Sequence, residues 1–391
     1  MWKRIDERWL GSRAVDRPLA GRRILDLSRV LAGPLATQTL ADLGADVVKV
    51  ERPVHGDDTR AWGPPFVAGD AAYFLALNRN KRSVALDLRS EDGAAAVRRL
   101  AEHSDVLVEN FRPGLMTELG LDLAELRDAS PGLITCSLTA FAEESPAADR
   151  PGYDIIVQAL SGLMSVTGEH DGEPVKVGVA LLDVIAGLYA AVGILAALDE
   201  RTRTGRGRHV SVALFDTSVA AMVNQAANVL IGGVVPGRMG TAHPNISPYQ
   251  AFHGADRPFI LAAGNDRLFR RTCEVVGHPE WADDDRFATN AERVRHRDEL
   301  VRLLEDVFAS APADEWLARL QDAAVPCAPI RTIDEVFAAP EGAANVESVP
   351  DPVRDAILRL VRSPIRFDGE ALTTRTPPPR LGADGDEVLG G

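Results

Sequence analysis

Residues 23–50, RILDLSRVLAGPLATQTLADLGADVVKV, contain the pattern that decides the fold. The run from Arg23 to Ser28 predicts a buried strand, and the run from Asp46 to Val50 predicts a second one. Between them, Ala32-Gly33-Pro34 opens a helix with proline in its first turn, and Gly44 ends it. A strand, a helix and a strand joined by short connections predict a parallel pair with a right-handed crossover.

The same alternation returns further along the chain. Strands are expected at 83–88, 105–109 and 133–137, with helices at 92–103 and up to residue 127. This order predicts an α/β fold with a Rossmann-like, doubly wound sheet. Ligands bind such sheets at the carboxyl ends of the strands, which here fall at 28–33, 51–60, 86–89 and 110–114.

Composition divides the chain into parts. Residues 1–215 form the N-terminal part of the large Rossmann-like domain, and the glycine-rich stretch 216–245 predicts a linker. Short strands and helices over 246–328 predict a smaller α+β domain, which a C-terminal segment, 329–391, follows.

The charge balance excludes some classes of partner. The chain has 43 basic and 57 acidic residues and a net charge of −14. Such an acidic protein is poorly suited to bind nucleic acid or an anionic membrane. The three cysteines are far apart and the histidines are scattered, so we expect no disulfide, no metal site and a reducing cytoplasm. Residues 1–9 lack the apolar segment of a secretory signal.

An apolar run from Val179 to Leu198 carries a single charge, that of Asp183. Its length would allow a membrane span, but we favour a buried helix because an acid near the end of a lone span is costly. The carboxylate has two compatible interpretations. It is the N-cap of a helix over 184–200, or it is a nucleophile that the helix N-terminus keeps ionised.

A basic cluster, Asn78-Arg79-Asn80-Lys81-Arg82, lies near a predicted strand end, as do Lys49, Arg52, Arg60 and Arg112. These charges are either solvated loop residues or a site for a polyanionic ligand such as a nucleotide diphosphate.

Several elements taken in order resemble the class III CoA-transferases, a group that includes formyl-CoA transferase and carnitine CoA-transferase and has α-methylacyl-CoA racemase as a relative. The elements are LAGP at 31–34, LGADVVKVE at 43–51, NKRS at 80–83, ENFRPG at 109–114, TGRG at 204–207 and PRLG at 379–382. The resemblance runs from about Arg23 to Leu389, which is nearly the whole chain.

The resemblance implies an interlocked homodimer in which segment 329–391 returns to the large domain. It places the family's nucleophile on Asp183 and an aromatic residue of the active site on Tyr73. It also implies coenzyme A contacts at Leu31, Ala32, Arg52, Leu86, Asp87, Leu88, Arg89, Asn110, Phe111, Arg112, Gly152, Tyr153 and Asp154.

Three positions depart from the family pattern. Leu31 stands where formyl-CoA transferase has glutamine, which disfavours an oxalyl or formyl substrate. Glu118 replaces a basic residue that is frequent in the family. The tail reads Leu381-Gly382-Ala383-Asp384-Gly385 in place of Leu-Gly-Glu-His-Thr.

The reaction class depends on one position. Racemases of the family have histidine in a Gly-His-Asp motif, whereas this chain has Gly152-Tyr153-Asp154, and tyrosine is a poor base at neutral pH. We therefore favour a CoA-transferase over the two alternatives, a racemase-like isomerase and a CoA-binding paralogue without turnover. No permanent cofactor is expected, because a coenzyme A thioester is the substrate.

The stretch from Gly240 to Gln250 resembles the subgroup that uses succinyl-CoA with dicarboxylic acids. His243 and Asn245 could hydrogen-bond a distal carboxylate of the acyl group, and a plain turn at the domain entry is the other interpretation.

Overall fold

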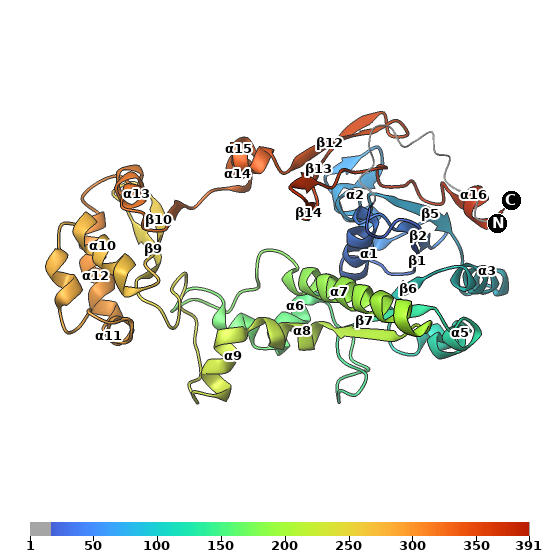
Figure 1. Ribbon diagram of the computed structural model, residues 1–391, viewed down its shortest axis with the longest axis horizontal. Coiled ribbons are helices and arrows are strands. Elements are labelled where there is room, and N and C mark those ends of the chain that lie inside the picture. Colours follow the sequence, from blue (N-terminus) through green and yellow to red (C-terminus); the bar gives the residue numbers. More distant parts are fainter. Residues whose placement is uncertain (1–16, 391) are drawn as a thin grey trace. The chain divides into compact units, whose positions relative to one another are not determined.

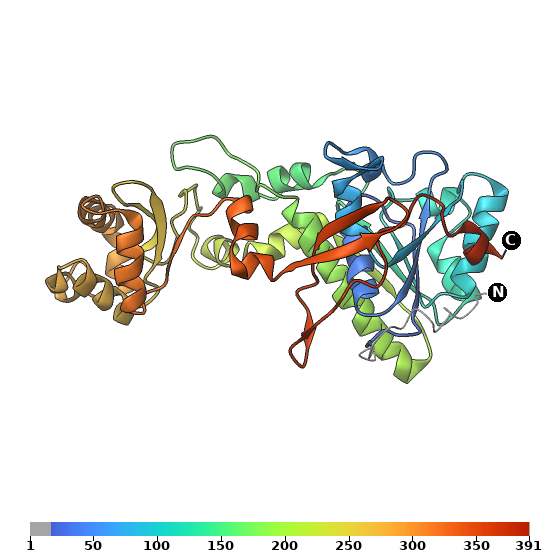
Figure 2. The same cartoon turned by 90° about the horizontal axis from the view of Figure 1, so that it is seen from above.

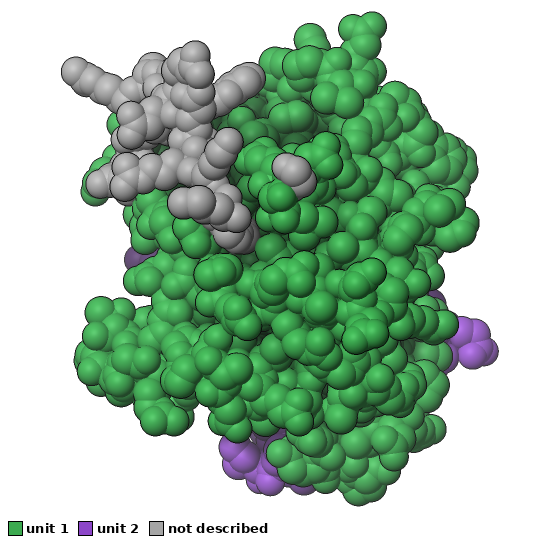
Figure 3. Space-filling model, turned by 90° about the vertical axis from the view of Figure 1, so that its right-hand side faces the viewer, with its two compact units in different colours: residues 1–161, 178–221, 342–391 green, residues 162–177, 222–341 purple. Residues whose placement is uncertain are grey.

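The computed structural model describes residues 17–390, so the predicted lack of a signal segment at 1–9 lies outside the described residues. The chain forms two compact units, which Figure 3 colours separately. Unit 1 is built from residues up to 161, from 178–221 and from 342 onward. Unit 2 is built from 162–177 and 222–341. The chain therefore passes between the units four times.

Unit 1 contains the predicted parallel sheet (Figure 1). Its strands have the order β5 (Lys81–Ala85), β2 (Asp46–Glu51), β1 (Arg23–Asp26), β6 (Val106–Glu109), β7 (Ile134–Thr139) and β8 (His209–Ala213). All neighbouring pairs are parallel, and Leu25 of β1 lies opposite Val48 of β2 and Leu107 of β6. This confirms the α/β class and brings the carboxyl ends of the strands to one edge.

Helices cover both faces of the sheet. One face carries α1 (Ala32–Asp42) and α7 (Leu181–Thr204), which pack against each other. On the other face, α3 (Glu91–Glu102), α4 (Leu115–Glu118) and α5 (Leu123–Ala129) close a core with Val97, Leu107 and Leu126. Short elements complete this part: η2 (Asp58–Ala61), α2 (Ala72–Leu77), α6 (Asp154–Leu160) and α8 (Leu214–Ala221).

The long apolar helix α7 extends beyond its predicted bounds. It begins at Leu181 and runs to Thr204, whereas the sequence predicted a helix over 184–200. The reason is that the hydroxyls of Thr202 and Thr204 bond to the carbonyls of Leu198 and Glu200, one helical turn back. Gly205 then ends the helix at φ +71°. By length and composition α7 could cross a membrane, a test that core helices of soluble proteins also pass.

The C-terminal segment completes unit 1. A hairpin of β12 (Val346–Asp351) and β13 (Ala356–Val361) packs against Phe74 of α2. Next to it, Arg354 is buried and its guanidinium binds Asp70 at 2.6 Å and Asp351 at 2.6 Å. The final helix α16 (Gly385–Leu389) places Val388 in the sheet core, and Asp384 accepts the Ser83 N–H at 2.7 Å.

Unit 2 is a smaller α+β body, also seen in Figure 2. Its antiparallel sheet has the order β11 (Cys327–Pro329), β10 (Pro258–Ala262) and β9 (Tyr249–His253). The sheet packs against α10 (Asp266–Val275), α12 (Arg297–Phe308) and α13 (Ala313–Asp322) around Phe252, Phe259, Phe308 and Trp316. Unit 2 also contains α9 (Val223–Leu230), α11 (Asn290–Arg295) and α14 (Ile333–Ala338).

Candidate active site

Asp183 lies in the first turn of α7, as the third residue of the helix. The N-cap is Ala180, so the prediction of Asp183 as N-cap of a helix over 184–200 is wrong by one turn. The two residues before Asp183, Leu181 and Leu182, are already helical. Its side chain is mostly shielded from solvent.

A second carboxylate, Asp154 at the start of α6, takes the capping role. Its Oδ2 accepts the N–H of Leu182 at 2.8 Å and the N–H of Asp183 at 3.4 Å. Its Oδ1 accepts a hydrogen bond from the side-chain amide of Gln158 at 2.5 Å. Asp154 therefore fixes the position of the turn that carries Asp183.

This arrangement changes the charge state expected of Asp183. Burial, and then the negative charge of Asp154, raise the pKa of Asp183 to about 7. Both effects oppose the expectation that the helix N-terminus keeps Asp183 ionised. The physical reason is that the N–H groups of the first turn bind Asp154 and not Asp183 itself.

Tyr73 on α2 is within electrostatic reach of this pair. Burial raises the pKa of Tyr73, and the charges of Asp183, Asp154 and Asp57 raise it further. Its ring packs edge-on against Trp62, with 5.6 Å between ring centroids. Tyr73, Asp154 and Asp183 therefore interact electrostatically, and the roles that the resemblance implies for Tyr73 and Asp183 stay predictions.

The loop that follows β1 is held in a strained conformation. Val30 has φ +71°, which is an outlier for a β-branched residue. The Val30 N–H donates to both oxygens of Asp57 at 3.3 Å, and the side chain of Asn110 bonds both backbone groups of Arg29 at 2.7 and 2.8 Å. The strained residue directly precedes Leu31 and Ala32, at the start of α1.

Glycine allows α7 to approach this loop. A Cβ atom at Gly187 would come within 2.6 Å of the Ala32 carbonyl oxygen. Gly187 lies one helical turn after Asp183, so the loop and the turn bearing Asp183 belong to one packed assembly.

The other expected coenzyme A contacts follow the ends of strands or precede α6. Leu86 and Leu88 pack against the sheet core, and Asp87 accepts the Arg89 N–H at 3.0 Å. The exposed side chains of Arg52 and Arg112 pair with Asp58 and Glu118. Phe111 is buried, whereas Tyr153 is 67% exposed beside Gly152.

The basic cluster is mostly internal, so neither of its two interpretations holds for its buried members. Lys49 pairs with Asp57 at 2.9 Å and Lys81 pairs with Asp26 at 3.0 Å, and all four side chains are fully buried. Arg79 binds Asp42 and Arg60 binds Glu51, again in buried pairs. The signal missed in the sequence was the matching set of acids on other elements: Asp26 on β1, Glu51 on β2, Asp42 on α1 and Asp57 before η2.

His243 and Asn245 lie in unit 2, in the loop before β9. The Nδ1 atom of His243 accepts the Asn245 N–H at 3.1 Å, and the ring packs edge-on against Tyr249. The exposed side-chain amide of Asn245 donates to Asn228 at 3.0 Å. Sequence reasoning missed Asp57 and Gln158, because no motif distinguishes them from other polar residues.

Comparisons with known proteins identify the family of the chain. The sequence model of CoA-transferase family III matches residues 19–385. A succinate–glutarate CoA-transferase of Agrobacterium fabrum is 46% identical over 379 residues, 95% of each chain. The human succinyl-CoA:glutarate CoA-transferase is 40% identical over 376 residues, which cover 95% of this chain and 85% of that protein.

Solved structures agree as well. A CaiB/BaiF family protein of Brucella suis is 46% identical with a TM-score of 0.82, over 95% of this chain and 98% of that one. A hypothetical protein of Mycobacterium tuberculosis is 33% identical with a TM-score of 0.85, over 95% and 99%. The chain therefore belongs to CoA-transferase family III, and it is an enzyme of that family.

Proposed function

We propose that the enzyme transfers coenzyme A from succinyl-CoA to a dicarboxylic acid such as glutarate, with Asp183 as the nucleophile. The observation that carries this proposal is the poorly hydrated Asp183 carboxylate, held in place by Asp154 and close to Tyr73. The names of the related succinate–glutarate and succinyl-CoA:glutarate transferases support the choice of substrates.

The reaction exchanges one acyl group for another without net proton or electron transfer. A carboxylate oxygen of Asp183 attacks the thioester carbon, the C–S bond breaks, and a mixed anhydride and CoA thiolate form. The thiolate attacks the aspartyl carbonyl, which releases the donor acid and gives an aspartyl-CoA thioester. The acceptor carboxylate then displaces the thiolate, and the thiolate attacks the acceptor carbonyl of the new anhydride. This last step restores the Asp183 carboxylate.

Coenzyme A is proposed to bind along the edge where β1, β2, β5 and β6 end. The expected contacts follow these strand ends, and they are Leu31, Ala32, Arg52, Leu86–Arg89 and Asn110–Arg112. The expected contacts at Gly152–Asp154 lie at the start of α6, where Asp154 caps the turn that carries Asp183. Among them, the exposed guanidinium of Arg52 and the residue Arg89 are the proposed phosphate contacts.

The enzyme is further proposed to act as an interlocked homodimer in the cytoplasm. Helix α7 carries exposed apolar side chains, among them Tyr189 and Val192, at 50% and 62% exposure. Apolar surface of this kind is typical of an interface. The free thiols of Cys136, Cys273 and Cys327 fit a reducing compartment.

The test is a transfer assay with succinyl-CoA and a panel of mono- and dicarboxylic acids. We expect glutaryl-CoA or a related dicarboxyl-CoA to form, and hydroxylamine to trap an acyl adduct on Asp183. Deuterium uptake by a 2-methylacyl-CoA without any acceptor acid would instead support the racemase alternative.

A further inference from the structure

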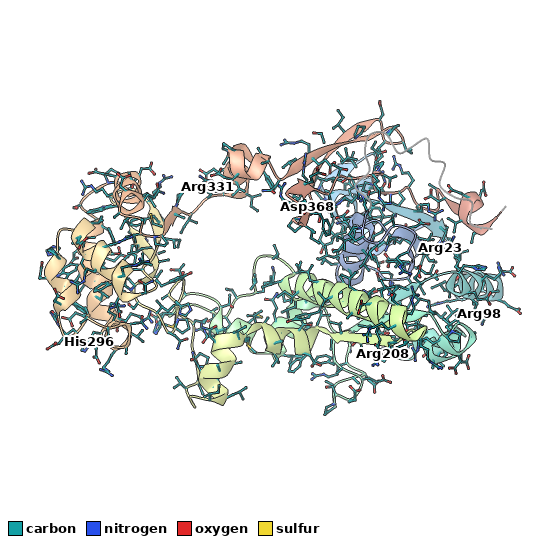
Figure 4. The ribbon with its side chains drawn as sticks, viewed as in Figure 1. Arg23, Arg98, Arg208, His296, Arg331 and Asp368 are labelled. Atoms are coloured by element: carbon teal, nitrogen blue, oxygen red, sulfur yellow. The ribbon has the colours of Figure 1, made fainter. Side chains whose placement is uncertain are left out.

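A buried ion pair holds the loop that follows β1, the strand that begins at Arg23, which is labelled in Figure 4. Asp57 precedes η2 and Lys49 lies on β2, and their fully buried side chains are paired at 2.9 Å. The Lys49 ammonium donates to the Ser28 carbonyl at 2.7 Å, and Asp57 accepts the Val30 N–H at 3.3 Å. The pair therefore binds the backbone of the loop at two residues.

The Asp57 carboxylate is itself fixed in place. Burial opposes its ionisation, but the charge of Lys49 and the hydrogen bonds from Thr59 outweigh burial, so the pKa of Asp57 lies below its usual value. Thr59 donates its N–H at 2.9 Å and its hydroxyl at 2.8 Å to Oδ1 of Asp57. Asp57 is therefore a charged acceptor in a defined position, which strengthens its bond to the loop.

The conformation of Val30 depends on such a bond. A β-branched residue at φ +71° is strained, and it keeps this conformation only where its surroundings fix it. The preceding residue, Arg29, is fixed through both of its backbone groups by the side chain of Asn110. At Val30 itself, the N–H bond to Asp57 opposes the strain.

Two parts of the proposed active site follow from the direction of the chain at Val30. Leu31 and Ala32 come directly after it and are expected coenzyme A contacts. The Ala32 carbonyl oxygen would lie 2.6 Å from a Cβ atom at Gly187, so α7 packs closely on this loop. If Val30 relaxed to a negative φ, the chain would leave it in another direction, and Leu31 and Ala32 would move.

We propose that Asp57, supported by Lys49, is a positioning residue for coenzyme A. It holds Val30 in the left-handed conformation that places Leu31 and Ala32 at the binding edge of the sheet. All of these residues belong to unit 1. The inference rests on the proposed function, which places coenzyme A at the ends of β1, β2, β5 and β6.

The experiment measures the Kd of CoA by calorimetry with the full chain, and stability by urea melts. Asp57→Ala removes both the acceptor of the Val30 N–H and the partner of Lys49, and it should raise the Kd at least tenfold. Asp57→Asn also leaves Lys49 without this anion, so its stability should fall as in Asp57→Ala. Its amide oxygen still accepts the Val30 N–H, so its Kd should stay close to that of the wild type.

A second variant tests the same contact without disturbing the ion pair. In Val30→Pro the N–H is lost and φ is held at roughly −65°, so the Kd should rise as in Asp57→Ala although Lys49 keeps its partner. This variant decides the question if the Asp57 variants do not fold. The matched control is Asp42→Asn, which breaks the buried pair with Arg79 at the far end of α1 and should lower stability without changing the Kd.

A role of Asp57 in stability alone predicts a different pattern. A variant that is less stable but still folded at the assay temperature keeps its Kd for CoA. Equal increases of the Kd in Asp57→Ala and Asp57→Asn, or a Val30→Pro protein that binds CoA like wild type, would overturn the inference. Since binding is measured apart from transfer, a wild type that binds CoA but transfers it to no acid would refute the proposed function alone.

Discussion

Replacing Asp154 by asparagine should move the acid limb of the pH–rate profile to lower pH. The asparagine oxygen can still accept the Leu182 N–H, so the turn of α7 keeps its cap while the negative charge beside Asp183 is lost. Since that charge is the second cause, after burial, of a pKa of about 7, its removal should lower the pKa of Asp183. If the pKa of Asp183 falls by about one unit, its ionised form is stabilised by ~1.4 kcal/mol relative to its protonated form.

The effect on rate follows from the ionised fraction of Asp183, because only the carboxylate is a nucleophile. At pH 6, roughly a tenth of a carboxyl with a pKa near 7 is ionised, and a fall of one pH unit raises this to about half. At pH 8 the carboxyl is mostly ionised in both proteins. The ratio of kcat/KM at pH 6 to that at pH 8 should therefore increase roughly fivefold in Asp154→Asn.

This ratio cancels any loss that does not depend on pH, such as a weaker coenzyme A contact at position 154. A matched control is Asp149→Asn, which removes an exposed acid from the same region and should leave the ratio unchanged. A folded Asp154→Asn protein with an unshifted acid limb would refute the reasoning that Asp154 sets the charge state of Asp183.

Four other predictions follow from the same geometry. Asp183→Asn should abolish transfer, measured by product CoA ester, yet retain CoA binding measured by calorimetry. It should also be more stable than wild type, and by more at pH 8 than at pH 5 in urea melts. The reason is that a carboxyl whose folded pKa is raised stabilises the fold at low pH and loses that contribution as the pH rises toward 7. Arg52→Ala and Arg89→Ala should each raise KM for succinyl-CoA about tenfold with kcat little changed, and an unchanged KM in both would remove them from the phosphate site. Val30→Gly should relieve the strain of the left-handed backbone at this position, so the urea midpoint of unfolding should stay the same or rise. A clear loss of stability would contradict the inference that Val30 is strained. Arg354→Met should lower stability by about 3–5 kcal/mol in the same melts, because Asp70 and Asp351 would lose a buried partner.

The sheet was predictable because short stretches of sequence are enough to identify its strands. Apolar runs such as 23–28 and 46–50, separated by a helix with proline in its first turn, specify strands and a crossover without distant information. The end of α7 was not predictable from the sequence, because threonine is typical of turns. The hydroxyls of Thr202 and Thr204 instead bond back to helix carbonyls, and these bonds are visible only in the structure.

The site was predictable only in part. A charged residue in an apolar run identified Asp183, but the sequence contains no sign that Asp154 would take the N–H groups of the same turn. Likewise, Lys49 and Lys81 read as surface cations, because their partners Asp57 and Asp26 come from other elements. Pairing across a sheet is a property of the fold and not of any short segment.

The junction between β5 and the C-terminal residues has a consequence for biosynthesis. Ser83 leaves the ribosome well before its partner Asp384 and the core residue Val388, which lie far along the chain. At ordinary elongation rates of ~5–20 residues per second, about 300 residues of further synthesis take roughly 15–60 s. During that time one side of the sheet lacks its final helix, so the nascent chain is a natural client for chaperones. A ribosome-stalled chain that ends before residue 382 should remain sensitive to protease near β5, whereas unit 2, closed by β11 at residue 329, can already be folded.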